Sequence, residues 1–187
     1  MRVIAGQFRS RQLRSLRDLD IRPTSDRLRE ALFNVLTSGN PEALKGSVWI
    51  DLFAGTGAVG IEALSRGAAM VYSVESSRHA ADLLRKNLGS LGIVQGFQVL
   101  QRESAKAIAQ LARQQILPDF IFLDPPYQSH EAYVETLGSL SNSPISEDAV
   151  VIAEHEKKFD PGEAFGSLRR TRKLQQGDAA LSFYRRA

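Results

Sequence analysis

The chain has 187 residues, of which 43% are hydrophobic, a formal net charge of +3 and no cysteine. This length can bury the core of one domain, and the lack of Cys excludes disulfides, thiolate nucleophiles and Cys-ligated metal centres. No run approaches the roughly 20 apolar residues that span a bilayer. The basic first residues lack the apolar segment of a secretory signal. We therefore expect a cytoplasmic protein that does not enter a membrane.

Charge is distributed unevenly along the sequence. Residues 1–30 hold eight Arg against four acidic residues, and residues 167–187 hold five Arg and one Lys against one Asp. The segment between them holds ten basic and sixteen acidic residues. Arg suits bidentate contacts to phosphate, so two Arg-rich ends predict contact with nucleic acid. Arginines that are merely solvated are the alternative.

The first elements lie in the basic N-terminal segment. Residues 1–22 contain two possible short strands, at 2–5 and 12–16. Thr24, Ser25 and Asp26 then precede an apolar stripe at helical spacing over residues 28–36, and Gly39-Asn40-Pro41 would end that helix.

From residue 48 onward, short apolar runs alternate with helical patterns. Strands are predicted over residues 48–53, 70–75, 97–101, 120–124 and 149–153, and helices over 59–65, 78–91, 105–116 and 130–140. Two further strands, 168–175 and 179–185, flank a turn at Gly177-Asp178. Such alternation predicts an α/β fold, Rossmann-like and doubly wound. Its mostly parallel sheet of seven strands would end in a C-terminal antiparallel hairpin and follow a basic N-terminal extension.

A glycine loop follows the first of these strands. Gly55, Gly57 and Gly60 satisfy the G-x-G-x-x-G pattern, and Glu75 ends the next strand, where such folds hold ribose hydroxyls. The pattern alone fits a nicotinamide dinucleotide, another nucleoside ligand or a structural turn. Asp51 favours a cationic ligand, because a carboxylate inside a strand is costly to bury and would repel a pyrophosphate. S-adenosylmethionine, with its sulfonium and amino groups, meets that requirement.

Further cofactor contacts are predicted beside these residues. The loop itself contributes Phe53, Ala54 and Thr56. At the end of the third strand, Glu103 or Ser104 is placed to meet the adenine, with helix capping by Ser104 as the alternative.

The fourth strand ends at Asp124-Pro125-Pro126-Tyr127. Ligands of open α/β sheets bind beyond the carboxyl ends of strands. The two prolines fix the backbone and remove N–H donors, so the Asp124 carboxylate and the Pro125 carbonyl can both accept hydrogen bonds from an exocyclic amine. Tyr127 offers a ring on which an extracted base can stack. These four residues are the predicted catalytic loop for methyl transfer to nitrogen, and a capped Pro-rich turn is the alternative.

Several segments together resemble the RsmD family of bacterial 16S rRNA guanine-N2 methyltransferases, which have the class I S-adenosylmethionine-dependent fold. They are residues 6–11 (GQFRSR), 22–34 (RPTSDRLREALFN), 51–68 (DLFAGTGAVGIEALSRGA) and 124–127 (DPPY). Residues 22–34 are the most family-specific segment. Departures are Glu103 in place of the usual Asp, Gln176 in place of a frequent Tyr, and Thr56 in place of Ser.

The resemblance implies methyl transfer to the N2 amine of a guanine in a partly assembled small ribosomal subunit, by a monomer that needs no metal. It implies that residues 1–40 form an extension with a helix over the active site and that residues 41–187 form the methyltransferase domain. The candidate contacts to 16S rRNA are basic or polar side chains near the two ends of the chain: Arg9, Arg11, Arg22, Thr24, Arg27, Arg29, Arg169 and Arg170. His79, His130 and His155 lack ligand spacing and are expected at the surface or at caps.

Three other functions remain open at this stage. A DNA adenine-N6 methyltransferase would use the same Asp-Pro-Pro-Tyr loop, although 187 residues leave little room for a DNA-recognition domain. A nicotinamide-dependent oxidoreductase would use the glycine pattern, and Asp51 argues against it. A non-catalytic RNA-binding module would keep the fold without the chemistry.

Overall fold

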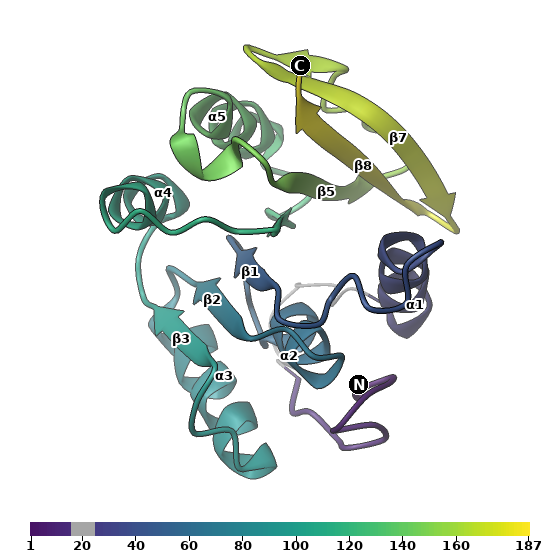
Figure 1. The fold of residues 1–187 in the computed structure, drawn as a ribbon, viewed down its shortest axis with the longest axis vertical. Helices are drawn as coiled ribbons and strands as arrows, with labels where there is room; N and C mark the ends of the chain where they lie inside the picture. Colours follow the sequence, from purple (N-terminus) through teal and green to yellow (C-terminus); the bar gives the residue numbers. More distant parts are fainter. Residues whose placement is uncertain (16–24) are drawn as a thin grey trace.

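Within residues 1–15 and 25–187, which the computed structural model describes, eight strands form one sheet in the order β3-β2-β1-β4-β5-β8-β7-β6 (Figure 1). The parallel strands are β1 (Val48–Asp51), β2 (Met70–Val74), β3 (Phe97–Leu100), β4 (Phe120–Leu123) and β5 (Val150–Glu156). The antiparallel strands are β6 (Ala164–Phe165), β7 (Leu168–Gln176) and β8 (Ala179–Arg186). The predicted seven strands become eight, because β6 is too short to leave an alternating pattern.

Helices cover both faces of the sheet (Figure 1). One face carries α1 (Asp26–Leu36), α2 (Ala58–Ser65) and α3 (Arg78–Leu91). The other carries α4 (Ser104–Arg113), α5 (His130–Ser141) and the 3₁₀ helix η1 (Pro144–Ser146). The Ser25 hydroxyl caps α1 by accepting the Leu28 N–H, as the polar start of this helix predicts. The core is correspondingly divided by the sheet, with Trp49 stacked between Phe33 and Phe120 on the α1 side.

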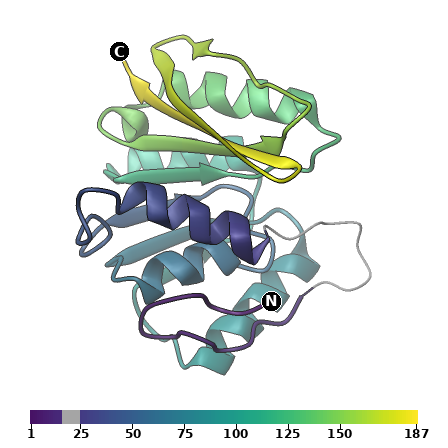
Figure 2. The ribbon, with the colours of Figure 1, turned by 90° about the vertical axis from the view of Figure 1, so that its right-hand side faces the viewer.

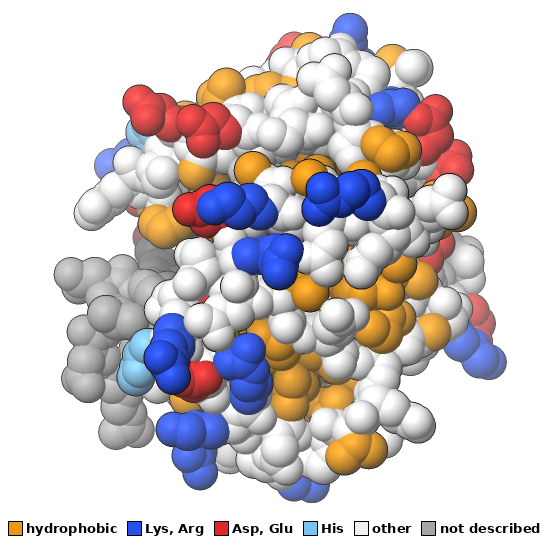
Figure 3. Space-filling model, turned by 90° about the vertical axis from the view of Figure 1, so that its left-hand side faces the viewer, with side chains coloured by type: hydrophobic (Ala, Val, Ile, Leu, Met, Phe, Trp, Pro, Cys, Tyr) orange, Lys and Arg blue, Asp and Glu red, His pale blue; other side chains and the backbone are white. Residues whose placement is uncertain are grey.

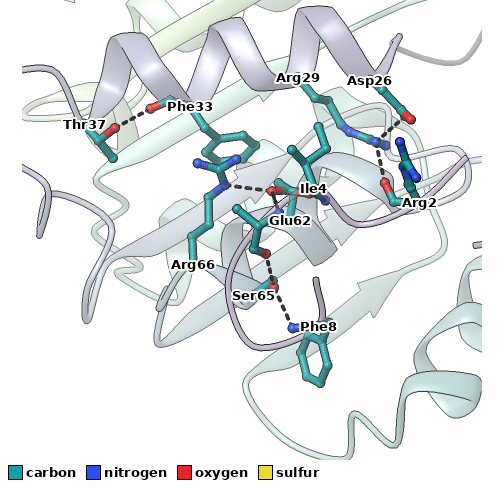
Figure 4. A network of polar contacts seen from close by, with 11 residues as sticks. Arg2, Ile4, Phe8, Asp26, Arg29, Phe33, Thr37, Glu62, Ser65 and Arg66 are labelled. Atoms are coloured by element: carbon teal, nitrogen blue, oxygen red, sulfur yellow. Dashed lines mark hydrogen bonds and ion pairs between the residues drawn. The ribbon is translucent and has the colours of Figure 1, made fainter. Parts of the chain in front are cut away.

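Residues 1–15 pack against α2 and α3, where Val3 and Leu13 are buried. The two strands predicted here are reduced to a single bridge between Arg2 and Gln12, a correction to the sequence-based expectation. Buried polar side chains of α2 hold the segment instead (Figure 4). The Glu62 carboxylate accepts the N–H groups of residues 4 and 5 at 2.7 and 3.0 Å and the Arg66 guanidinium at 2.7 Å.

Because β1 to β5 are parallel, their carboxyl ends share one edge of the sheet, called here the carboxyl edge. The turn between β7 and β8 lies at this edge, since Gln176 pairs with Ala179 and Ala179 pairs with Glu156 at the end of β5. The first turn of α1 lies on the same side of the molecule (Figure 2). The loops after the parallel strands, the start of α1 and the hairpin turn therefore surround one region.

No helix in the described part of the chain is long and apolar enough to cross a membrane.

Candidate functional site

Three carboxylates at the carboxyl edge point to the same face of the sheet. Asp51 ends β1, Asp124 follows β4 and Glu154 lies near the end of β5. The residues two positions earlier, Trp49, Phe122 and Ile152, all belong to the core on the α1 side. Side chains alternate along a strand with a period of two, so the carboxylates face α1 and α2 as well.

The strand register sets the heights of these carboxylates. Asp51 pairs with Phe122, so Asp124 lies one pleat beyond Asp51. Leu123 pairs with Ala153, so the next residues, Asp124 and Glu154, are neighbours across strands that lie about 4.8 Å apart. The edge is thus strongly acidic on the face that α1 covers.

Asp51 is deeply buried and strongly perturbed. Its side chain is 1% exposed, and Oδ1 has no hydrogen-bond partner. Burial raises the pKa of Asp51 to about 7. The backbone N–H groups of Phe53 and Gly60 oppose this shift, and the negative charges of Glu75 and Glu154 add to it. A buried carboxylate oxygen without a donor indicates that a cationic group or a hydrogen-bond donor completes this position.

Glu75 joins the glycine loop to β2. Its Oε2 accepts the Gly55 N–H at 2.8 Å, and its Oε1 accepts the Ser77 N–H at 2.8 Å. Gly57 begins α2 with φ +81°, and a Cβ there would lie 2.8 Å from Cγ of Leu84. Glycine is therefore required at residue 57 by both the backbone conformation and the available space.

Asn87 on α3 ties the same loop to the N-terminal segment, a contact the sequence analysis did not identify. Its amide nitrogen donates to the Thr56 carbonyl at 2.9 Å and to the Arg14 carbonyl at 3.1 Å, and its oxygen accepts the Arg14 N–H at 2.9 Å. A polar residue at a buried position of the α3 stripe was the available signal. Glu62 gave the same signal inside the otherwise apolar α2.

The Asp124–Tyr127 loop is held from β5 and α5. Tyr133 of α5 is fully buried, and its hydroxyl donates to the Glu154 carbonyl at 2.9 Å and lies 3.3 Å from the Pro125 carbonyl. Burial raises the pKa of Tyr133, so this hydroxyl remains a donor. The Tyr127 hydroxyl donates to Oε1 of Glu154 at 3.3 Å. Sequence reasoning missed Tyr133, because its partners are backbone carbonyls 8 and 21 residues away, which no local pattern identifies.

A cleft of about 160 Å³ opens beside this loop. It lies between the first turn of α1, the Asp124–Tyr127 loop and the β7–β8 turn. Its lining residues are Ser25, Arg27, Leu28, Tyr127, Glu154 and residues 176–179. The cleft therefore lies next to the neighbouring Asp124 and Glu154 and has space for a flat group.

The predicted cofactor residues gather along the carboxyl edge. The loop from Phe53 to Gly57 runs from β1 into α2, where Ala54 N–H bonds to the Val74 carbonyl at 2.9 Å. Glu103 is exposed and pairs with Lys106 at 2.9 Å. Glu103, and not Ser104, is the N-cap residue of α4, which corrects the alternative role considered for Ser104.

The sequence suggested that Arg29 contacts RNA, but the structure buries this residue. It lies on the inner side of α1 with 0% exposure, and it donates to the Arg2 carbonyl and to Asp26, both at 2.7 Å (Figure 4). Burial lowers its pKa, while the carboxylates of Asp26, Glu62 and Glu154 oppose that shift. Arg29 therefore supplies a buried positive charge within the acidic region, and it joins α1 to the N-terminal segment.

The other predicted RNA contacts occupy different places. Arg27 is exposed and lines the cleft. Arg9 and Arg11 are exposed on the N-terminal segment, where Arg11 donates to the Ser90 carbonyl at 3.0 Å. Arg22 and Thr24 lie outside the described residues.

Arg169 and Arg170 lie at the edge opposite the cleft. Arg169 pairs with Arg185, seven residues along β7 from Gln176, which places it roughly 23 Å from the hairpin turn at 3.3 Å per residue. Arg170 forms ion pairs with Asp160 at 2.5 Å and with Glu163 at 3.0 Å. β7 runs in the same direction as β5, because both are antiparallel to β8, so the start of β7 lies away from the carboxyl edge. This direction, which the charge pattern does not reveal, removes both arginines from the candidate site.

Charge is mixed on the side of the molecule where α3 and α4 border the β3 edge of the sheet. Basic and acidic side chains are interspersed there (Figure 3), and α3 and the start of α4 carry the ion pairs Asp82–Arg85 and Glu103–Lys106.

His155 departs from the expected surface or capping position. It is fully buried, with Nε2 2.9 Å from the Ser182 hydroxyl and Nδ1 2.9 Å from the Glu156 carbonyl, and burial lowers its pKa. His79 and His130 are exposed as predicted. Across residues 1–15 and 25–187, no group of three or more His, Asp or Glu side chains is arranged to hold a metal ion.

The sheet order, the glycine loop after β1, the acidic residue after β2 and the Asp-Pro-Pro-Tyr loop after β4 together define a class I methyltransferase fold. A family model described as "Conserved hypothetical protein 95" matches residues 1–185, and the chain belongs to this family. This membership confirms the resemblance to the RsmD family.

Named relatives agree with this assignment. The chain is 32% identical over 188 residues to "Putative rRNA methyltransferase YlbH" of Bacillus subtilis, covering 100% of this chain and 99% of the relative. It is 35% identical to "Ribosomal RNA small subunit methyltransferase D" of Haemophilus influenzae, covering 84% and 79%. The solved structure of "Putative methyltransferase yhhF from Escherichia coli" superposes with a TM-score of 0.82 at 29% identity, covering 100% and 97%.

S-adenosylmethionine is the cofactor of this fold class, and the residues present fit it. Asp51 offers a buried oxygen without a donor, which suits a cationic amino or sulfonium group. The Gly55–Gly57 loop brings the backbone to the start of α2, and Glu75 stands where a ribose binds in such folds.

Proposed function

We propose that the chain transfers the methyl group of S-adenosylmethionine to the exocyclic N2 amine of a guanine in 16S rRNA. The observation that carries the proposal is the pair of carboxylates at the carboxyl edge. A buried Asp51 oxygen without a hydrogen-bond donor lies one pleat before Asp124 of the Asp-Pro-Pro-Tyr loop. The relatives named as small-subunit rRNA methyltransferases support RNA as the substrate class.

When bound, S-adenosylmethionine supplies a methyl group attached to positively charged sulfur. Asp51 would hold a cationic part of it, and Glu75 would orient its ribose. Asp124 and the Pro125 carbonyl would accept the two amine hydrogens, which localises the nitrogen lone pair and aims it at the methyl group. The nitrogen would gain the methyl group as the methyl–sulfur bond breaks and a neutral thioether leaves. The nitrogen would then lose a proton, which the Asp124 carboxylate on this loop can accept.

Positioning supplies most of the acceleration in this mechanism, because in-line transfer needs the two reacting atoms held in contact. The buried Tyr133 hydroxyl steadies the loop through the Glu154 and Pro125 carbonyls. Tyr127 would stack on the extracted base at the mouth of the cleft.

We further propose that the substrate is a partly assembled small ribosomal subunit, that the protein acts as a monomer in the cytoplasm, and that no metal takes part. Arg27 at the cleft and the exposed Arg9 and Arg11 would contact rRNA phosphates.

A DNA adenine-N6 methyltransferase is the second candidate, since the same loop accepts any exocyclic amine. The experiment that separates the two incubates the protein with labelled S-adenosylmethionine and either unmodified small-subunit particles or duplex DNA. We expect label in 16S rRNA, and its loss in Asp124→Ala with cofactor affinity retained. Label in DNA alone, or undiminished transfer by Asp124→Ala, would contradict the proposal.

A further inference from the structure

The carboxylate of Glu154 has no role in the methyl transfer described above. It is 2% exposed, lies beside Asp124 across adjacent strands and lines the cleft with Tyr127 and Arg27. Its side chain lies on the α1 side of the sheet, as do those of Asp51 and Asp124.

We propose that Glu154 determines the choice of base by accepting the N1–H of guanine, while Asp124 and the Pro125 carbonyl hold the N2 amine. This inference rests on the proposed function, because it takes a guanine amine as the acceptor. It assigns to Glu154 a contact with the substrate and not a part in proton transfer.

Hydrogen-bond complementarity supports the assignment. Guanine presents N1–H and the N2 amine as adjacent donors on one edge, and bases extracted into a pocket are recognised through that edge. Asp124 and Glu154 come from adjacent strands, so their carboxylates can approach two adjacent donors of one base from neighbouring backbone positions. Adenine presents a lone pair at N1, which the Glu154 carboxylate would repel, so the same pair of acceptors selects against adenine.

The bond from Tyr127 is compatible with this role. The Tyr127 hydroxyl lies 3.3 Å from Oε1 of Glu154, and a carboxylate has about four lone-pair sites, so it can accept several donors together. Tyr127 would then connect the stacking surface to the group that selects the base. The competing explanation is that Glu154 only orients Tyr127.

A base analogue separates these explanations. 2-Aminopurine keeps the amine at C2 but has no N1–H. We would ligate a synthetic segment carrying guanine or 2-aminopurine at the mapped target into 16S rRNA, reconstitute particles, and measure kcat/KM for both. The wild type should prefer guanine by about 10- to 100-fold, the factor for a hydrogen bond to a charged acceptor.

Glu154→Gln should lower kcat/KM for guanine and reduce this preference to near one, because the new amide can donate to N1 of 2-aminopurine. Glu154→Asp, which keeps a carboxylate, should retain the preference at a lower rate. Tyr127→Phe is the matched control: it removes the hydroxyl that contacts Glu154 and should lower kcat/KM equally for both bases.

An unchanged preference in Glu154→Gln, or a wild type that does not distinguish the two bases, would overturn the inference while N2 methylation itself stands. If the wild type methylates neither base, the proposed function fails first. If Glu154→Gln does not fold, the wild-type comparison and Glu154→Asp still decide: a lost preference in Glu154→Asp would overturn the inference, and a retained one would support it.

Discussion

Replacement of Asp51 by Asn should make the unliganded protein more stable at neutral pH while weakening its cofactor binding. Burial raises the pKa of Asp51 from 3.8 to about 7. Between these two values the folded state binds one proton more than the unfolded chain. The stability that depends on this proton is complete below pH 3.8 and is lost as the pH rises to about 7.

The shift in the pKa of Asp51 corresponds to a loss of folding stability on the order of 4 kcal/mol, because one pKa unit is worth about 1.4 kcal/mol. Asp51→Asn does not titrate, so its stability should rise relative to the wild type by about 2 kcal/mol between pH 5 and pH 7. Contributions of other titrating groups are common to both proteins and cancel in this difference.

Urea unfolding of both proteins at several pH values between 5 and 8 measures this difference, and calorimetry at pH 8 measures S-adenosylmethionine affinity. We expect Asp51→Asn to have a higher free energy of unfolding and a lower affinity for S-adenosylmethionine than the wild type. A stability difference that is constant with pH, or full cofactor affinity in the variant, would refute the reasoning about this buried carboxylate.

Three further results are expected. Gly57→Ala should lose about 1–3 kcal/mol of stability in urea unfolding, because its Cβ would meet an α3 side chain at 2.8 Å. Gly55→Ala, with open space around its Cβ, should lose less, and equal losses would contradict the steric argument. Asn87→Ala should lower stability by about 2–4 kcal/mol and weaken cofactor binding, because three backbone partners lose their bonds. Arg27→Ala should raise KM for ribosomal particles in a methyl-transfer assay, whereas Arg169→Ala, at the opposite edge, should not. A larger effect from Arg169→Ala would place the RNA on the other side.

The sequence predicted the repeating elements because their periodicity is local. The helix expected at residues 78–91 has those bounds, and each parallel strand begins within one residue of its predicted start. The two functional loops were also predictable, since glycines and prolines limit the backbone by their own chemistry.

Long-range placement was not predictable. Arg29 is buried because the packing of α1 against residues 1–15 turns it inward, although its neighbour Arg27 stays exposed. Arg170 lies far from the cleft because β7 runs in the same direction as β5, so that its first residues lie away from the carboxyl edge. Only the strand order and pairing reveal this direction. The significance of Glu154 likewise depends on its register beside Asp124, which no local pattern reports.

The identity of the methylated nucleoside tests the central claim most directly. Unmodified small-subunit particles would be incubated with the protein and labelled S-adenosylmethionine, the 16S rRNA digested to nucleosides, and the labelled product identified by mass spectrometry. The Asp-Pro-Pro-Tyr loop predicts label on an exocyclic amine, and the proposed contact of Glu154 with guanine N1–H predicts N2-methylguanosine as the labelled product. Label in N6-methyladenosine, or in a ribose or ring-carbon position, would contradict the account.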